Sequence, residues 1–341
     1  MGRTILEMEN ISKSFGATQA LSGIGFSLEE GEIHALLGEN GAGKSTLIKI
    51  LGGIYQPDTG MIRIDGKEVK MAGVQEAQET GIGIIHQEIV LVPYLSVSEN
   101  IFLGRELKTK LGTKDMKAMN RQAKEMTERL GLYVDVTMPV GKLSIAQQQM
   151  VEIIKAISFH IKILVMDEPT SSLSDEEVEK LFEVVGRLKR EGVTILYISH
   201  YLEEVLRVSD KVIVLRDGRH IATRDAAALT QEQVVGMMVG RTVERTMPRE
   251  PPAQSPVRLQ IEDLCSPKGI RHANLYARKG EIVGLYGLNG AGKTECLLAA
   301  CGLDRRLGGR VSVDGAPLDG MDIAGSIAAG MVLVPEDRRG Q

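Results

Sequence analysis

The residues from Gly38 to Thr46 have the composition and spacing of a loop that holds a phosphate chain. They fit the pattern G-x-x-x-x-G-K-[ST]. Its glycines let successive backbone N–H groups turn toward one anion, Lys44 can reach the β- and γ-phosphates, and the Ser45 hydroxyl can ligate Mg²⁺. The predicted nucleotide contacts are Gly38, Glu39, Asn40, Gly41, Ala42, Gly43, Lys44, Ser45 and Thr46.

The residues on either side of this loop predict the elements that must position it. The apolar run at 33–37 predicts a buried strand, and residues 47–51 begin a helix. The N-terminus of that helix adds a partial positive charge where the phosphates would lie. A chance match in a glycine-rich chain would not bring this strand and helix with it, so we expect a nucleotide site.

Two adjacent carboxylates, Asp167 and Glu168, follow a second apolar run at 163–166. Adjacent acids at the end of a buried strand are costly unless they bind a cation or a reacting group. Asp167 suits Mg²⁺ held together with the Ser45 hydroxyl, and Glu168 is placed to orient or deprotonate an attacking water. The alternative is a pair of solvated loop acids, which the upstream phosphate loop disfavours.

Four other polar or aromatic positions each allow two interpretations on their residues alone. Gln87 and His200 both end apolar runs, so each is either a sensor of a γ-phosphate or metal or an ordinary loop residue. Phe15, between strands predicted at 5–11 and 24–28, either stacks on a purine base or caps a small sheet. Ser144 is either the N-cap of a helix or part of an anion site.

Composition limits the class of protein. At 341 residues the chain is long enough for more than one domain, and its net charge of -4 gives no electrostatic footprint for nucleic acid. Three cysteines fit neither a disulfide framework nor a zinc pattern, so they indicate a reducing compartment. Without an apolar leader or membrane span, we expect a cytoplasmic chain that reaches a membrane only through a partner.

The chain contains an internal repeat. A first domain at 1–240, with a helical region at about 96–160, precedes a Pro-rich linker at 241–256. Residues 257–341 then repeat its beginning, and Glu336 falls where the first copy has Gln87. The second phosphate loop contains Gly287, Gly292, Lys293 and Thr294.

The order of these motifs resembles the nucleotide-binding domain of ATP-binding-cassette (ABC) proteins across the whole first domain. Phe15 matches the base-stacking aromatic, Gln87 the Q-loop and His200 the switch histidine. Ser144 and Gln147 lie in the signature, which reads Leu-Ser-Ile-Ala-Gln in place of Leu-Ser-Gly-Gly-Gln. The D-loop reads Ser-Ser-Leu-Ser at 171–174, with serine where aspartate is commoner.

This resemblance implies an α/β P-loop NTPase fold with a mainly parallel core sheet, an antiparallel β subdomain and an all-helical subdomain. The signature variant and the tandem arrangement look like the ATPases of ribose/galactose-type monosaccharide importers. Such a protein uses ATP and Mg²⁺ and works with membrane permease subunits and a periplasmic or extracellular sugar-binding protein. Its expected place is the cytoplasmic face of the bacterial inner membrane.

ABC domains work in head-to-tail pairs, each ATP lying between one phosphate loop and the partner's signature. Residues 257–341 contain no second signature, acid pair or switch histidine, so we expect turnover only when two first domains dimerise. Two alternatives are a nucleotide-binding remnant without hydrolysis and a soluble ABC protein of translation. The short linker and acidic net charge disfavour the latter, and a DNA-repair role lacks its cysteine clusters and coiled-coil heptads.

Overall fold

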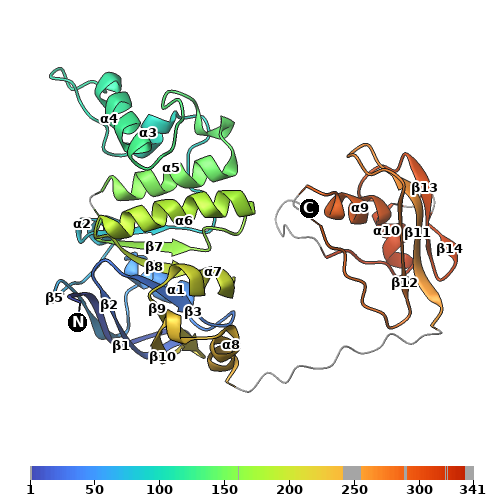
Figure 1. Ribbon diagram of the computed structural model, residues 1–341, viewed down its shortest axis with the longest axis horizontal. Helices are drawn as coiled ribbons and strands as arrows, with labels where there is room; N and C mark the ends of the chain where they lie inside the picture. The colour runs from blue at the N-terminus through green and yellow to red at the C-terminus, as the bar shows by residue number, and fades with distance from the viewer. Residues whose placement is uncertain are drawn as a thin grey trace. The chain divides into compact units, whose positions relative to one another are not determined.

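The computed structural model describes residues 2–159, 161–240, 255–287, 290–318, 320 and 322–334 (Figure 1). The chain divides into two compact units, Met1–Glu244 and Arg245–Gln341, and each is described by itself. Most of the predicted linker at 241–256, and Glu336, lie outside the described residues.

A six-stranded sheet forms the centre of the first unit, in the order β10-β9-β3-β8-β7-β6. Five neighbouring strands, β6, β7, β8, β3 and β9, run parallel, and β10 pairs with β9 antiparallel across a turn at Asp217-Gly218. Parallel strands covered on both faces are largely apolar, and every residue of β3 and β8 is buried. The strand bounds are β3 Ile33–Leu37, β6 Ile82–Ile85, β7 Ile163–Asp167, β8 Thr194–Ile198, β9 Lys211–Arg216 and β10 Arg219–Asp225.

An antiparallel sheet of four strands lies beside this core, in the order β2-β1-β4-β5. The strands are β1 Thr4–Phe15, β2 Thr18–Glu29, β4 Thr59–Ile64 and β5 Lys67–Glu68. The predicted limits of the first two strands were too short, and Phe15 ends β1 rather than lying in a loop. The reason is Gly16, whose φ of 59° allows a tight turn directly after Phe15.

Helices cover both faces of the central sheet and create two hydrophobic cores. The alternation along β3 sends Ala35 into one core and Leu36 into the other. The core shared with β1, β2 and β4 contains α1 Lys44–Leu51 and α2 Val74–Glu79. The opposite core contains α5 Ile145–Ile157, α6 Asp175–Arg190, α7 Leu202–Val208 and α8 Gln231–Val239.

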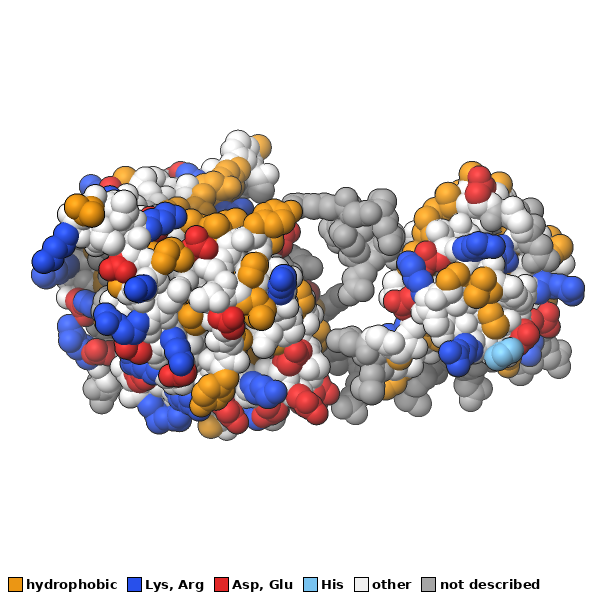
Figure 2. Space-filling model, turned by 90° about the horizontal axis from the view of Figure 1, so that it is seen from above, with side chains coloured by type: hydrophobic (Ala, Val, Ile, Leu, Met, Phe, Trp, Pro, Cys, Tyr) orange, Lys and Arg blue, Asp and Glu red, His pale blue; other side chains and the backbone are white. Residues whose placement is uncertain are grey.

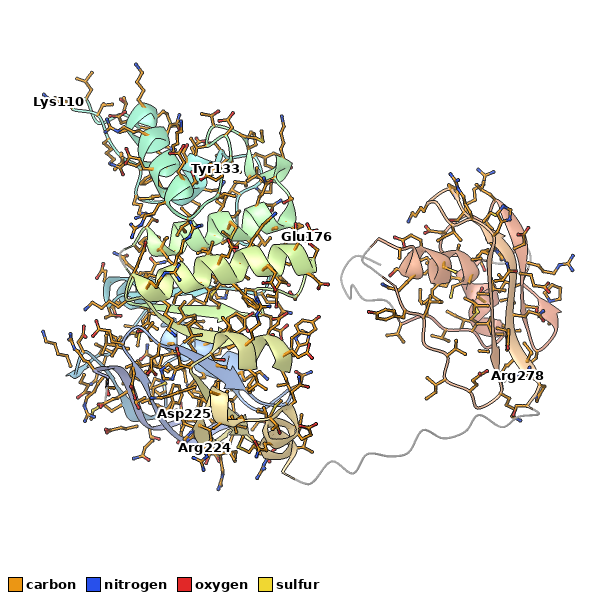
Figure 3. The ribbon with its side chains drawn as sticks, viewed as in Figure 1. Lys110, Tyr133, Glu176, Arg224, Asp225 and Arg278 are labelled. Carbon is orange, nitrogen blue, oxygen red and sulfur yellow. The ribbon has the colours of Figure 1, made fainter. Side chains whose placement is uncertain are left out.

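The residues between β6 and β7 form helices and loops, which confirms the predicted helical character of this region. They include α3 Val97–Ile101, α4 Met116–Arg129 and a 3-10 turn at Val140–Lys142. In Figure 3, Lys110 marks a loop beside α4 that points away from the rest of the unit. The face of the first unit seen in Figure 2 carries acidic and basic side chains close together. In the part of the chain that the structure describes, no helix is long and apolar enough to cross a membrane.

The second unit repeats the antiparallel sheet in the order β12-β11-β13-β14. Its elements are β11 Val257–Cys265, β12 Ala273–Arg278, α9 Lys293–Ala300, β13 Gly308–Val313, β14 Ala316–Pro317 and α10 Ile323–Ala328. Residues 281–287, which repeat the β3 region, form no strand, and Ile282 and Tyr286 are each 99% exposed. In the first unit β8 and β9 flank β3, whereas no strand among the described residues of the second unit takes either place.

His34 on β3 is fully buried, and this position makes the stability of the first unit depend on pH. Its Nε2 accepts the backbone N–H of Glu29 at 3.1 Å. Burial lowers the pKa of His34 to about 4; the Lys211 charge acts in the same direction, and Glu29 and Asp210 oppose it. The His34 imidazole therefore binds a proton near pH 6.5 in the unfolded chain, but only near pH 4 in the folded unit.

We expect His34 to lower the free energy of unfolding by about 3 kcal/mol in total between pH 6.5 and pH 4, with no further loss below that range. His34→Gln keeps an acceptor for the Glu29 N–H but has no proton to gain, so its unfolding should lose this pH dependence. Urea unfolding of the first unit at several pH values measures the difference. His272→Gln, at an exposed site in the second unit, is the control; parallel curves for wild type and His34→Gln would contradict the assignment.

Candidate nucleotide-binding site

The predicted phosphate loop connects β3 to α1 and has the backbone conformation that its glycines permit. Gly41 and Gly43 have φ values of 85° and 100°, in the left-handed region that favours glycine. A Cβ at Gly38 would lie 2.5 Å from the carbonyl oxygen of Leu215 on β9, so no larger residue fits there without a shift of backbone. The loop is thus shaped both by its own turns and by the neighbouring strand.

Lys44, the first residue of α1, folds back over this loop. Its Nζ donates to the carbonyl oxygens of Gly38 at 2.5 Å and Glu39 at 3.1 Å. Burial lowers the pKa of Lys44, while the nearby carboxylates of Glu168 and Asp167 act in the opposite direction. The ammonium group is therefore held between the loop and the acid pair, where an incoming phosphate chain can exchange with the two carbonyl partners. The Ser45 side chain beside it is exposed.

Three predicted catalytic residues meet at the carboxyl edge of the sheet. Glu168 follows β7 directly; its Oε2 accepts a hydrogen bond from Gln87 Nε2 at 3.0 Å, and its Oε1 lies 3.4 Å from His200 Nδ1. Gln87 and His200 each lie two residues beyond the ends of β6 and β8, the two neighbours of β7 in the sheet. Adjacent parallel strands end at the same edge, and this topology brings the three side chains together.

Asp167 provides a carboxylate suited to a divalent cation. Burial raises its pKa, and the charge of Glu168 raises it further, while His86 and Lys44 oppose the shift. A cation would relieve this unfavourable placement of negative charge, and the residues present therefore fit Mg²⁺. No set of three or more His, Cys, Asp or Glu side chains among the described residues could hold a metal ion alone. Mg²⁺ commonly binds through one or two carboxylates plus substrate phosphates, so nucleotide oxygens would complete its shell.

Phe15 lies at the end of β1, with 43% of its surface exposed. Its ring packs edge-on against Tyr55, with 5.1 Å between the centroids, and Lys13 Nζ lies 5.7 Å from its centroid. The contact with Tyr55 supports the ring and leaves part of it open to a base. Tyr55 could not be predicted as part of this site from the sequence, because no motif marks its position after α1.

Ser144 is the N-cap of α5, which confirms its predicted structural role. Its backbone N–H donates to Gln147 Oε1 at 3.0 Å, and its Oγ accepts from the Gln147 N–H at 3.3 Å. None of the contacts found among the described residues connects either side chain to the phosphate loop. At the D-loop serine, the backbone N–H and the hydroxyl of Ser174 both donate to Glu177 Oε2, at 2.9 and 3.0 Å, where α6 begins.

The second phosphate loop repeats the arrangement of the first where the structure describes it. Gly292 has a φ of 88° and precedes α9, and Lys293 Nζ donates to the carbonyl oxygen of Gly287. Thr294 is exposed in the first turn of the helix, as Ser45 is in α1. Residues 288–289, in the middle of this loop, lie outside the described residues.

Comparison with known proteins assigns the family. A model of the ABC transporter family matches residues 21–171 and 270–340, and each matched segment contains one of the two phosphate loops. The chain belongs to the ABC transporter family.

Similar sequences and solved structures agree with this ABC assignment. The chain is 44% identical to the ribose import ATP-binding protein RbsA of Chromobacterium violaceum and 47% identical to RbsA 1 of Rubrobacter xylanophilus, over 97% and 99% of its length. It spans about two thirds of those relatives, 66% and 68%. A nucleotide-free ATP-binding cassette of an ABC transporter matches with a TM-score of 0.61 and 29% identity, over 71% of this chain and 98% of that one.

A second cassette, solved in its ADP conformation, matches with a TM-score of 0.60 and 30% identity, over 69% of this chain and 95% of that one. These likenesses confirm the fold class predicted for this ABC chain, a P-loop NTPase with a mainly parallel core, an antiparallel sheet and a helical part. They also confirm the family that the motif order indicated.

Proposed function

We propose that this ABC chain binds Mg-ATP at residues 38–46 and hydrolyses it to drive import of a monosaccharide, with ribose the first candidate, through a membrane permease. The observation that carries the proposal is the convergence of Gln87 and His200 on the two oxygens of Glu168, beside Lys44. The sugar is suggested by the relatives named ribose import ATP-binding proteins, at 44% and 47% identity.

In this mechanism the loop N–H groups and Lys44 hold the phosphates, and Phe15 contacts the base. Asp167, Ser45 and Gln87 are the residues proposed to hold Mg²⁺. When bound, Mg²⁺ neutralises charge that develops on the phosphates. Glu168 orients or deprotonates the attacking water. Gln87 and His200 fix the two oxygens of Glu168 before a water arrives, and they are the proposed contacts to the γ-phosphate.

Completion of the site requires a second nucleotide-binding domain. Ser144 and Gln147, the proposed signature contacts, cap α5 and have no described contact with their own phosphate loop. We therefore propose that they serve the ATP of an apposed domain, either a second ABC domain or another copy of this chain. The other proposed partners are the permease subunits and a periplasmic or extracellular sugar-binding protein, with the chain on the cytoplasmic face of the bacterial inner membrane.

Reconstitution in proteoliposomes tests the proposal. The chain is combined with the permease and binding protein of a ribose importer from the same organism, and phosphate release and uptake of labelled ribose are measured, with galactose as the comparison sugar. We expect ATP-dependent ribose uptake and stimulated phosphate release. Binding of Mg-ATP without phosphate release would indicate a remnant, and phosphate release stimulated by ribosomes alone would indicate a soluble ABC protein of translation.

A further inference from the structure

One carboxylate close to the site accepts hydrogen bonds from three hydroxyl groups. Glu204 lies in the first turn of α7, and its Oε2 is 2.8 Å from Thr170 Oγ1, 3.2 Å from Tyr197 Oη and 3.4 Å from Ser199 Oγ. The three donors are buried, with exposures of 4%, 0% and 4%. Hydrogen bonds to an ionised acceptor are stronger than neutral ones, and a buried hydroxyl without its acceptor is unfavourable. The carboxylate therefore holds all three groups.

Two of these donors belong to the two turns that carry Glu168 and His200. Thr170 lies two residues after Glu168, and Ser199 directly precedes His200. The Ser199 hydroxyl oxygen also accepts the backbone N–H of Tyr201 at 3.0 Å. Both neighbours of His200 are thus connected to the same carboxylate, one directly and one through Ser199.

The turn at Glu168 needs such support because its backbone conformation is unusual. Glu168 has a φ of 49°, in the left-handed region that non-glycine residues occupy only when their surroundings hold them. Its N–H donates to the Ile198 carbonyl at 2.9 Å, which fixes the start of the turn. The Thr170 bond to Glu204 fixes its far side.

The third donor is the phenol of Tyr197, which must keep its proton in order to donate to Glu204. Tyr197 is fully buried in β8, and both burial and the charge of Glu204 raise its pKa. The phenol remains protonated and keeps donating. Tyr197 thereby attaches Glu204 to the centre of the sheet rather than to loops alone.

We propose that Glu204 is a positioning residue that fixes the turn of Glu168 relative to His200, and with it the 3.4 Å separation of His200 Nδ1 and Glu168 Oε1. The consequence for hydrolysis rests on the proposed function; the structural part does not. Glu203 provides a matched control, because it has the same charge in the same first turn of α7 but is exposed.

Hydrogen–deuterium exchange of the whole chain, followed by mass spectrometry, tests the structural part without ATP hydrolysis. In Glu204→Ala we expect exchange at 168–171 and 199–201 to accelerate roughly tenfold, the size expected from losing one hydrogen bond to a charged group. Glu204→Gln, which keeps the shape but offers a neutral acceptor, should accelerate these segments less. Glu203→Ala should leave both unchanged. Acceleration confined to α7, or equal in the two alanine variants, would overturn the proposal.

Steady-state kinetics in the reconstituted importer tests the consequence for hydrolysis. Glu204→Ala should lower kcat roughly tenfold with little change in the Kd for ATP. In a His200→Ala background the same change should cost clearly less in kcat, because the separation between His200 and Glu168 that Glu204 fixes no longer exists. Full, independent losses in both backgrounds would refute the positioning role. A wild-type importer that does not hydrolyse ATP would refute the proposed function instead, and the exchange experiment would still decide on Glu204.

Discussion

Replacing Lys44 with alanine should weaken the binding of Mg-ATP to the first phosphate loop by roughly a hundredfold. The reason is the position of its ammonium group, which lies over the loop and, among the described residues, donates hydrogen bonds to two backbone carbonyls. Charged phosphate oxygens are better acceptors than carbonyls, so the nucleotide gains a strong charge-assisted interaction that alanine cannot provide. The backbone N–H groups of the loop remain, and residual binding should come from them.

Nucleotide binding at the second phosphate loop has to be removed for this measurement, because Lys293 makes the same type of contact with Gly287. Isothermal titration with a non-hydrolysable ATP analogue should therefore compare Lys293→Ala with the double variant Lys44→Ala/Lys293→Ala. The two proteins differ only at the first loop, so the ratio of their Kd values isolates Lys44. Equal Kd values would exclude Lys44 as a phosphate ligand.

The sheet core and the edge of the site could be predicted from sequence because each strand has one simple signal. An apolar run that ends at a polar side chain describes β7 and β8, since both faces of these strands are covered. The ends of neighbouring parallel strands share an edge, so the proximity of Gln87 and His200 to Glu168 follows from strand order. The distances between them do not, because they depend on how the turns are held.

The features that sequence reasoning missed all depend on contacts between distant residues. Glu204 differs from Glu203 in the sequence by nothing that marks it, and only the packing of α7 places it beside Thr170, 34 positions earlier. The low pKa of His34 likewise arises from its burial, which a single histidine in an apolar run does not reveal.

In the second unit, strand formation also depends on distant residues that the local sequence does not show. Residues 281–287 repeat a sequence that is fully buried as β3 in the first unit, yet Ile282 and Tyr286 are exposed. Strand formation depends on neighbours to pair with as much as on composition. The apolar pattern alone therefore predicts what a segment can become in a complete sheet, and its partners decide whether it does.

Replacing Glu168 with glutamine should lower kcat for ATP hydrolysis by roughly 10²–10⁴-fold in the reconstituted importer, the range found when a general base is removed. The amide cannot accept a proton from water. It also offers only one acceptor oxygen to the two groups that now face the carboxylate, Gln87 Nε2 and His200 Nδ1. Phosphate release under saturating Mg-ATP measures the effect, and Glu176→Gln, at an exposed position on α6 (Figure 3), is the control.

Binding of Mg-ATP should survive this change and become slightly tighter, which separates loss of chemistry from loss of the site. The charge of Glu168 raises the pKa of Asp167, so its removal should leave Asp167 more readily ionised as a metal ligand. Glu168→Asp should give an intermediate kcat, because it keeps the charge but withdraws the carboxylate by one methylene. If Glu168→Gln hydrolysed ATP at the wild-type rate, Glu168 could not be the base. Its contacts with Gln87 and His200 would then have to serve only the structure of this edge.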